Sequence, residues 1–299
     1  MNLYIIILNS LKLSNTYLGI LFAILAYLSF SLLDAIQKTL VIYHTVFQML
    51  FIKYFFTLFL SFIEGYRKKN LRFFKTKNLK IQISRSILSI IESGLFVLSF
   101  RYLSLADAHS IASLTPVIVV ALSAIILREH VNLKTWIAIF VGFLGVLIIM
   151  RPGLTIFDPK SLIPLSAAFF LSCYQIVTRR ASEYDSTETS LFYTSIIGIF
   201  VMSLIIPFYW NPILPKYYIL FMGVGLFFSL GIYFQIIALS FTKASVVQPF
   251  HYTLILWSII LGFIFYNDLP DIATVIGALI ITFSGIYVLN NRSNSNKIN

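Results

Sequence analysis

The chain has 299 residues, of which 59% are hydrophobic and only 11% are charged, and its formal net charge is +11. Its mean hydropathy of +0.91 excludes a soluble globular protein, because no soluble fold could keep this much apolar surface away from water. The composition therefore predicts a protein embedded in a lipid bilayer.

Ten apolar segments follow one another along the chain, each close to the roughly 20 residues that a helix needs to cross a bilayer. They are apolar at neighbouring as well as at alternate positions, which favours helices over the strands of a membrane barrel. The first segment lacks a signal-peptide cleavage pattern, so it is expected to remain as a span. The predicted spans cover residues 17–37, 47–63, 84–102, 106–127, 133–150, 161–177, 189–209, 217–239, 245–266 and 272–289.

The first five spans resemble the last five. Segment 26–38 aligns with segment 167–179 without a gap at an offset of 141, and at the same offset the dipeptide Leu-Phe at 50–51 meets Leu-Phe at 191–192. Because each half holds an odd number of spans, the second half enters the membrane from the opposite side, so the halves are inverted copies. An internal repeat of this kind is typical of a transporter with a central site between two related halves.

The repeat divides the chain into three predicted parts. Residues 1–159 form the first five-helix repeat, residues 160–290 form the second, and the polar tail 291–299 is expected to be disordered. Pro116 in the fourth span and Pro249 near the start of the ninth each remove a backbone hydrogen bond. Corresponding helices of the two halves are therefore both expected to bend.

Basic residues are concentrated between the second and third spans. By the positive-inside rule this loop faces the cytoplasm, which places both termini there as well. Anchoring the orientation is one role for the loop, and contact with anionic lipid is another. The eight basic residues assigned to the loop are Arg67, Lys68, Lys69, Arg72, Lys75, Lys77, Lys80 and Arg85.

Several ionisable residues lie at membrane depth, where each costs roughly 2.5–3.5 kcal/mol on insertion scales and normally faces a cavity or a partner. Asp34, Lys53, Glu92 and His251 are the main examples, and Gln175 occupies the position of Asp34 in the second half. The candidate substrate-binding residues are Tyr27, Asp34, Lys53, Glu92, His109, Gln175, Tyr233, His251, Tyr252 and Trp257.

Each candidate also has a purely structural interpretation. Asp34 and Lys53 could form a buried ion pair, His251 could make a hydrogen bond between helices, and Gln175 could serve packing. The acidic candidates belong to the first half, so that half is expected to hold the charged end of a substrate, with the aromatic ninth span closing over the other end. The single Cys173 is interpreted as a packing residue.

The sequence contains no nucleophile, metal-binding or phosphate-binding motif, so we expect neither an enzyme, a metal site nor a cofactor. Small residues at Ala138 and Gly142, and at Ala273 and Gly277, indicate close helix contacts. Either the last helices of the two halves pack together there, or they form the contact of a homodimer. The basic charge is concentrated in one loop between membrane spans, which argues against nucleic acid as a partner.

Two segments resemble a known family. "SLTPVIVVALSAIILRE" at 113–129 and "ASVVQPFHYTLILWSIILGFIFYNDLP" at 244–270 are similar to the proline-containing fourth helix and to the ninth helix of the drug/metabolite transporter superfamily, EamA type. Asp268 stands where that family more often has Glu. The resemblance implies an all-α membrane protein with ten transmembrane helices in two inverted five-helix repeats, which moves small metabolites.

Within this superfamily, "VQPFHYTLILWSIILGF" together with "SFRYLSLADAHSIASLTPVIV" looks like the S-adenosylmethionine uptake transporters of obligate intracellular bacteria. This implies uptake of S-adenosylmethionine across a bacterial inner membrane, in exchange for S-adenosylhomocysteine. Glu92 or Asp34 would then meet the positive charge, Lys53 the carboxylate, and aromatic candidates the adenine. Two alternatives stay open: an exporter of amino acids or related amphipathic metabolites, and a membrane scaffold that transports nothing.

Overall fold

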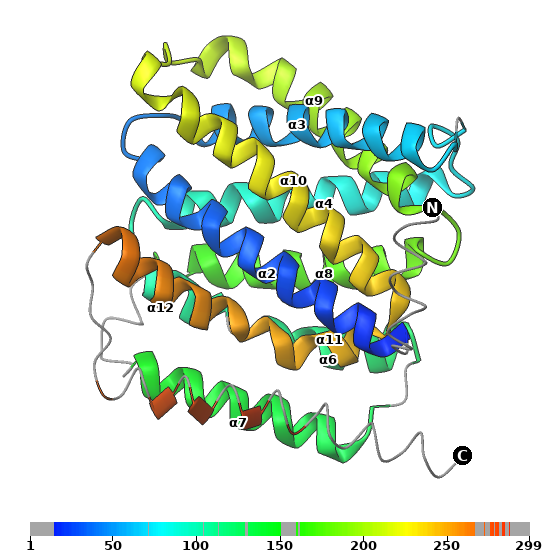
Figure 1. Ribbon diagram of the computed structural model, residues 1–299, viewed down its shortest axis with the longest axis vertical. Coiled ribbons are helices and arrows are strands. Elements are labelled where there is room, and N and C mark those ends of the chain that lie inside the picture. The colour runs from blue at the N-terminus through cyan, green and yellow to red at the C-terminus, as the bar shows by residue number, and fades with distance from the viewer. Residues whose placement is uncertain are drawn as a thin grey trace.

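The structure is a computed structural model that describes residues 15–70, 72–103, 105–112, 114–128, 131–150, 160, 162–266, 272, 276–277, 279–280, 283–284 and 287. Its regular elements in this part are all helical (Figure 1). In chain order they are α2 (Asn15–Leu40), α3 (Val46–Arg67), α4 (Leu79–Ser99), α5 (Leu105–Ala112), α6 (Thr115–Ile126), α7 (Leu133–Met150), α8 (Leu162–Ala181), α9 (Thr187–Tyr209), η3 (Pro215–Tyr217), α10 (Tyr218–Phe241), α11 (Ala244–His251) and α12 (Thr253–Tyr266).

Among the described residues, six helical segments are long and apolar enough to cross a membrane, and shorter apolar helices accompany them. Large hydrophobic side chains such as Phe59, Phe208 and Ile219 are more than half exposed, as expected for residues that face lipid. The chain is thus an all-helical, multi-pass membrane protein. The predicted tenth span lies largely outside the described residues, as do the division at 159–160 and the tail 291–299.

The two spans that contain Pro116 and Pro249 are broken. In the fourth span, α5 ends at Ala112 and α6 begins at Thr115, with Pro116 in its first turn. In the ninth span, α11 contains Pro249 and ends at His251, and α12 begins directly after Tyr252. The predicted bends in corresponding helices are confirmed.

One boundary was predicted wrongly. The third span was expected to begin at residue 84, and Arg85 was counted with the basic loop although it falls within that span, but α4 begins at Leu79. The side chain of Asn78 caps this helix by accepting a hydrogen bond from the Ile81 amide at 3.2 Å. Arg85 therefore lies inside the helix, and its side chain is fully buried.

Contacts between helices of the first half and helices of the second have counterparts under the repeat alignment. Under the alignment, α2, α3 and α4 correspond to α8, α9 and α10. The contact between α2 and α10 is then matched by the contact between α8 and α4, and α3 packs against its own counterpart α9. Figure 1 shows α3 and α9 together at one edge of the molecule and α7 at the opposite edge.

The last helices of the two halves contact each other within the chain. The Ser284 hydroxyl donates a hydrogen bond of 2.5 Å to the carbonyl oxygen of Ala138 in α7. Both residues are buried. Of the two interpretations of the small residues here, packing between these helices is the one that the structure supports.

Candidate functional site

A cavity with a volume of about 70 Å³ lies between helices of the two halves. Helices α2, α3, α4 and α5 line it from the first half, and α8, α10, α11 and α12 line it from the second. The polar lining consists of Tyr27, Asp34, Gln37, Lys53, Ser89, Glu92, Ser93, His109, Tyr174, Gln235 and His251. Aromatic rings of Phe30, Phe96 and Phe228 complete it.

Both carboxylates of the cavity come from the first half. Asp34 in α2 is buried, and its Oδ2 lies 3.3 Å from Nε2 of His109 in α5. Glu92 in α4 is partly exposed and lines the same cavity. The first half therefore supplies both acidic side chains of the cavity, which agrees with the expectation that this half holds the charged end of a substrate.

Lys53 is the basic counterpart of these carboxylates. Its side chain is 1% exposed, and its Nζ donates a hydrogen bond of 2.8 Å to the Ser93 hydroxyl. The same Nζ lies 5.0 Å from the centre of the Phe228 ring and interacts electrostatically with Glu92 and Asp34. The suggested ion pair between Lys53 and Asp34 is not formed, since no carboxylate in the described part of the chain lies within 4.0 Å of this ammonium.

Two polar aromatic groups face the cavity from opposite halves. The ring of His251 packs edge-on against Tyr27, with centroids 5.1 Å apart. The Tyr27 hydroxyl is buried and has no hydrogen-bond partner among the described residues. A solute that reached this position could therefore accept or donate a hydrogen bond there without displacing a protein group.

Three candidates lie away from the cavity. Gln175 is buried and accepts a hydrogen bond of 2.8 Å from Gln248, as its packing interpretation suggested. The hydroxyl of Tyr252 donates to the Ile139 carbonyl oxygen at 3.2 Å. Trp257 packs against an apolar cluster of α2, α10 and α11. Helical periodicity correctly predicted that these side chains face the protein interior, but they do not line the cavity.

Sequence reasoning missed Gln37 and Tyr174, which line the cavity, and the buried Arg85 beside it. A signal was present in α4, because Gln82, Arg85, Ser89, Glu92, Ser93 and Phe96 recur at helical spacing and form one polar face. The early start of this helix is what brings Arg85 onto that face.

Arg85 connects α4 to the second half directly below the cavity. Its guanidinium donates hydrogen bonds to the carbonyl oxygen of Ser190 and the hydroxyl of Thr194 in α9. It also donates to the hydroxyl of Tyr174 in α8 at 3.3 Å. Tyr174 lines the cavity, so a charged group holds the cavity wall from behind.

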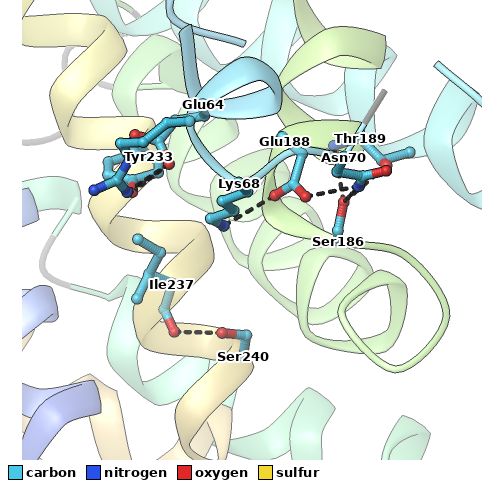
Figure 2. Close-up of polar contacts among 10 residues, drawn as sticks. Glu64, Lys68, Asn70, Ser186, Glu188, Thr189, Tyr233, Ile237 and Ser240 are labelled. Atoms are coloured by element: carbon cyan, nitrogen blue, oxygen red, sulfur yellow. Dashed lines mark hydrogen bonds and ion pairs between the residues drawn. The ribbon is translucent and has the colours of Figure 1, made fainter. Parts of the chain in front are cut away.

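A layer of charged contacts joins the halves at one end of the molecule, and we call it the ionic junction (Figure 2). Nζ of Lys68 lies 2.9 Å from Oε2 of Glu188, and the Asn70 amide donates to Oε1 of the same carboxylate at 2.8 Å. Nearby, the Tyr233 hydroxyl and Arg67 both donate to Glu64, at 2.9 and 2.7 Å. The candidate Tyr233 thus belongs to this junction and not to the cavity. The junction consists of Glu64, Arg67, Lys68, Asn70, Ser186, Glu188 and Tyr233.

A matching but uncharged layer, the neutral junction, joins the same helices at the other end. The hydroxyl of Thr45 donates to the Tyr209 carbonyl oxygen at 3.0 Å, and the amide of Gln48 donates to the Asn211 carbonyl oxygen at 2.5 Å. The rings of Phe47 and Tyr209 lie 5.0 Å apart.

The repeat offset of 141 relates the two junctions residue by residue. It places Thr45, Phe47 and Asn70 opposite Ser186, Glu188 and Asn211, and Lys68 opposite Tyr209. The aromatic pair at one end therefore corresponds to the ion pair at the other.

The loop beside the neutral junction contains a buried histidine. The ring of His44 packs edge-on against Tyr217 and Phe221, with centroids 5.2 and 4.9 Å away. Burial lowers the pKa of this imidazole from its ordinary value, despite an opposing contribution from Gln48. The uncharged form of this imidazole is therefore favoured.

Membrane-length helices in two related sets around one central cavity are the arrangement expected of a transporter built from related halves. The chain belongs to the EamA-like transporter family, which matches residues 17–151 and 161–291. It is therefore a member of a family of membrane transporters.

Named relatives are also transporters. The chain is 25% identical to an S-adenosylmethionine uptake transporter of Rickettsia prowazekii, over 94% of this chain and 95% of that one. It is 26% identical to a riboflavin transporter of Vibrio cholerae, over 72% of each chain. A solved crystal structure with 14% identity superimposes with a TM-score of 0.75, over 91% of this chain and 95% of that one, which supports the fold.

Proposed function

We propose that this protein takes up S-adenosylmethionine across the bacterial inner membrane, in exchange for S-adenosylhomocysteine. The observation that carries the proposal is the pair of carboxylates, Asp34 and Glu92, in one central cavity whose lining also includes aromatic rings and amides. The similarity to the Rickettsia uptake transporter over nearly the whole chain supports the same substrate.

The cavity offers a complement to each part of this substrate. The sulfonium and ammonium groups are cationic, and Glu92 and Asp34 can stabilise them. The rings of Tyr27, Phe96 and Phe228 provide apolar faces for the adenine. Amide groups of Gln37 and Gln235 can hydrogen-bond to the base or to the sugar.

We place the ionic junction and both chain termini on the cytoplasmic side, because basic residues are concentrated in the loop that contains Lys68 and Asn70. The ionic junction then separates the cavity from the cytoplasm. Release of the substrate inside the cell requires this layer to separate while the neutral junction stays closed. Binding of the exchanged product reverses the movement, and no nucleotide is hydrolysed.

The test is counterflow in proteoliposomes. Vesicles loaded with unlabelled S-adenosylhomocysteine are expected to accumulate labelled S-adenosylmethionine. Glu92→Gln is expected to reduce this uptake by at least about tenfold, which corresponds to about 1.4 kcal/mol of binding free energy. Glu183→Gln is the matched control, because this carboxylate is exposed in the loop before α9 and should leave uptake unchanged.

The same vesicles separate the alternatives. Uptake of riboflavin or of amino acids, with no uptake of the sulfonium compound, would assign another substrate to the same fold. Failure of every tested solute to move, with the protein folded and inserted, would favour the scaffold interpretation.

A further inference from the structure

We propose that Lys53 is a tethered counter-cation that sets the net charge of the solute which the cavity accepts. The inference rests on the proposed function, because it concerns the same cavity and a cationic substrate. It goes further in assigning Lys53 a role in charge selection, in place of a direct contact with the carboxylate of the solute.

The first observation is that this buried ammonium makes few direct polar contacts in the described part of the chain. A lysine ammonium has three donors. Among the described residues, one of them meets Ser93, and the face of the Phe228 ring lies on another side. The charge is balanced from a distance by Asp34 and Glu92, and not by a direct ion pair.

The second observation is the charge balance of the cavity. Among the described residues that line the cavity, the only lysine or arginine is Lys53, and the carboxylates are Asp34 and Glu92. The remaining titratable groups that face them are Tyr27, Tyr174, His109 and His251. Counted over the two carboxylates and the lysine, the formal charge of this lining is −1. The guanidinium of Arg85 lies behind the lining, at Tyr174.

A site with this charge is neutralised by a solute with one net positive charge. S-adenosylmethionine carries a sulfonium, an ammonium and a carboxylate, which sum to +1. S-adenosylhomocysteine lacks the sulfonium charge and sums to zero, and the decarboxylated analogue of S-adenosylmethionine sums to +2. Without the lysine the lining would carry −2, so each positive charge on the solute would be attracted more strongly and the relative affinity would shift towards the +2 compound.

A lysine that contacted the solute carboxylate directly would behave differently. Its removal would weaken S-adenosylmethionine and S-adenosylhomocysteine to a similar extent, because both carry that carboxylate. The decarboxylated analogue would be unaffected. The order of the three affinities therefore distinguishes the two roles.

The experiment measures binding of the three compounds to purified protein in nanodiscs at pH 8, for wild type and four variants. Wild type is expected to prefer S-adenosylmethionine. Lys53→Met is expected to shift the preference towards the decarboxylated analogue by at least about tenfold, and Glu92→Gln towards S-adenosylhomocysteine. The Lys53→Met/Glu92→Gln double variant restores the charge of −1 and the wild-type order, and Lys53→Arg keeps that order.

An unchanged order in Lys53→Met, or equal losses for the two carboxylate-bearing compounds, would overturn the inference. Should Lys53→Met fail to purify as a folded protein, Glu92→Gln decides the question, because its order must move towards the uncharged compound. Wild-type protein that binds none of the three compounds overturns the proposed function, and this inference with it.

Discussion

Arg85 is the largest fully buried side chain among the described residues, and it joins α4 to α8 and α9. We expect Arg85→Met to destabilise the protein, because Ser190, Thr194 and Tyr174 lose a charged donor in a dry interface. Unsatisfied buried groups cost about 1–3 kcal/mol each. About 1 kcal/mol shifts the melting temperature by roughly 2–4 °C at this size. The measurement is the apparent melting temperature in one detergent.

Lys80→Met is the matched control for this change. It removes a basic side chain from the same helix, one and a half turns earlier, where the side chain is exposed. Its melting temperature should stay near that of wild type. Equal melting temperatures for the two variants would mean that the buried guanidinium does not stabilise the interface.

Six of the ten candidate site residues line one cavity: Tyr27, Asp34, Lys53, Glu92, His109 and His251. Charge at membrane depth was the informative signal, since a bilayer tolerates ionisable groups mainly in cavities or pairs. Gln175, a neutral group, carried less information, because a buried amide is satisfied equally well by another helix. The contact between Asp34 and His109 depends on how separate helices meet, which no local pattern encodes.

At the scale of the helix, close approach between α3 and α9 depends on a missing side chain. A Cβ atom at Gly198 in α9 would lie 2.4 Å from the ring of Tyr54 in α3. Both elements are packed here, so overpacking should cost about 1–3 kcal/mol. We expect Gly198→Ala to lower the melting temperature.

Gly94→Ala in α4 is the control, since its Cβ would have Leu50 as its nearest neighbour at 3.7 Å, an ordinary contact. Alanine is the better helix former by roughly 0.5–1 kcal/mol, so this variant should be neutral or more stable. Stabilisation by both substitutions would show that the two helices do not approach as closely as described.

The helices themselves were predictable, because runs of about 20 apolar residues leave little alternative in a bilayer. Their ends were less so. The third span was started late because Lys80 and Arg85 read as loop residues, whereas the cap at Asn78 starts the helix before them. Positive charge marks a membrane boundary only when the side chain stays outside, and Arg85 is buried.

At the scale of the whole molecule, the two ends of the α3–α9 pair are equivalent in position and different in chemistry. The ionic junction contains the pair of Lys68 and Glu188, and the neutral junction contains the rings of Phe47 and Tyr209 at the corresponding positions. The Lys68 side chain is 34% exposed, whereas that of Glu188 is only 4% exposed. Charges that separate into water are solvated there and screened by salt, so this charged layer can open on its aqueous side. An aromatic contact has no such dependence on salt.

A disulfide across the ionic junction should therefore arrest the carrier in one state. Asn70 and Ser186 belong to opposite halves, and their side chains are in contact with Nδ2 and Oγ 3.5 Å apart, so this pair is chosen for substitution by cysteines. In a background with Cys173→Ala, we expect oxidation of the Asn70→Cys/Ser186→Cys variant to stop uptake and reductant to restore it. Binding of S-adenosylmethionine should survive oxidation, because the cavity stays intact.

The oxidised Asn70→Cys single variant controls for damage by the oxidant, and it should transport at its unoxidised rate. If the bridged double variant also transports at the rate of its reduced form, the two halves do not separate at this end during the cycle. The neutral junction would then be the moving part. Loss of uptake together with loss of binding would mean instead that the bridge distorts the cavity, and the halves could not be moving as rigid units around a fixed site.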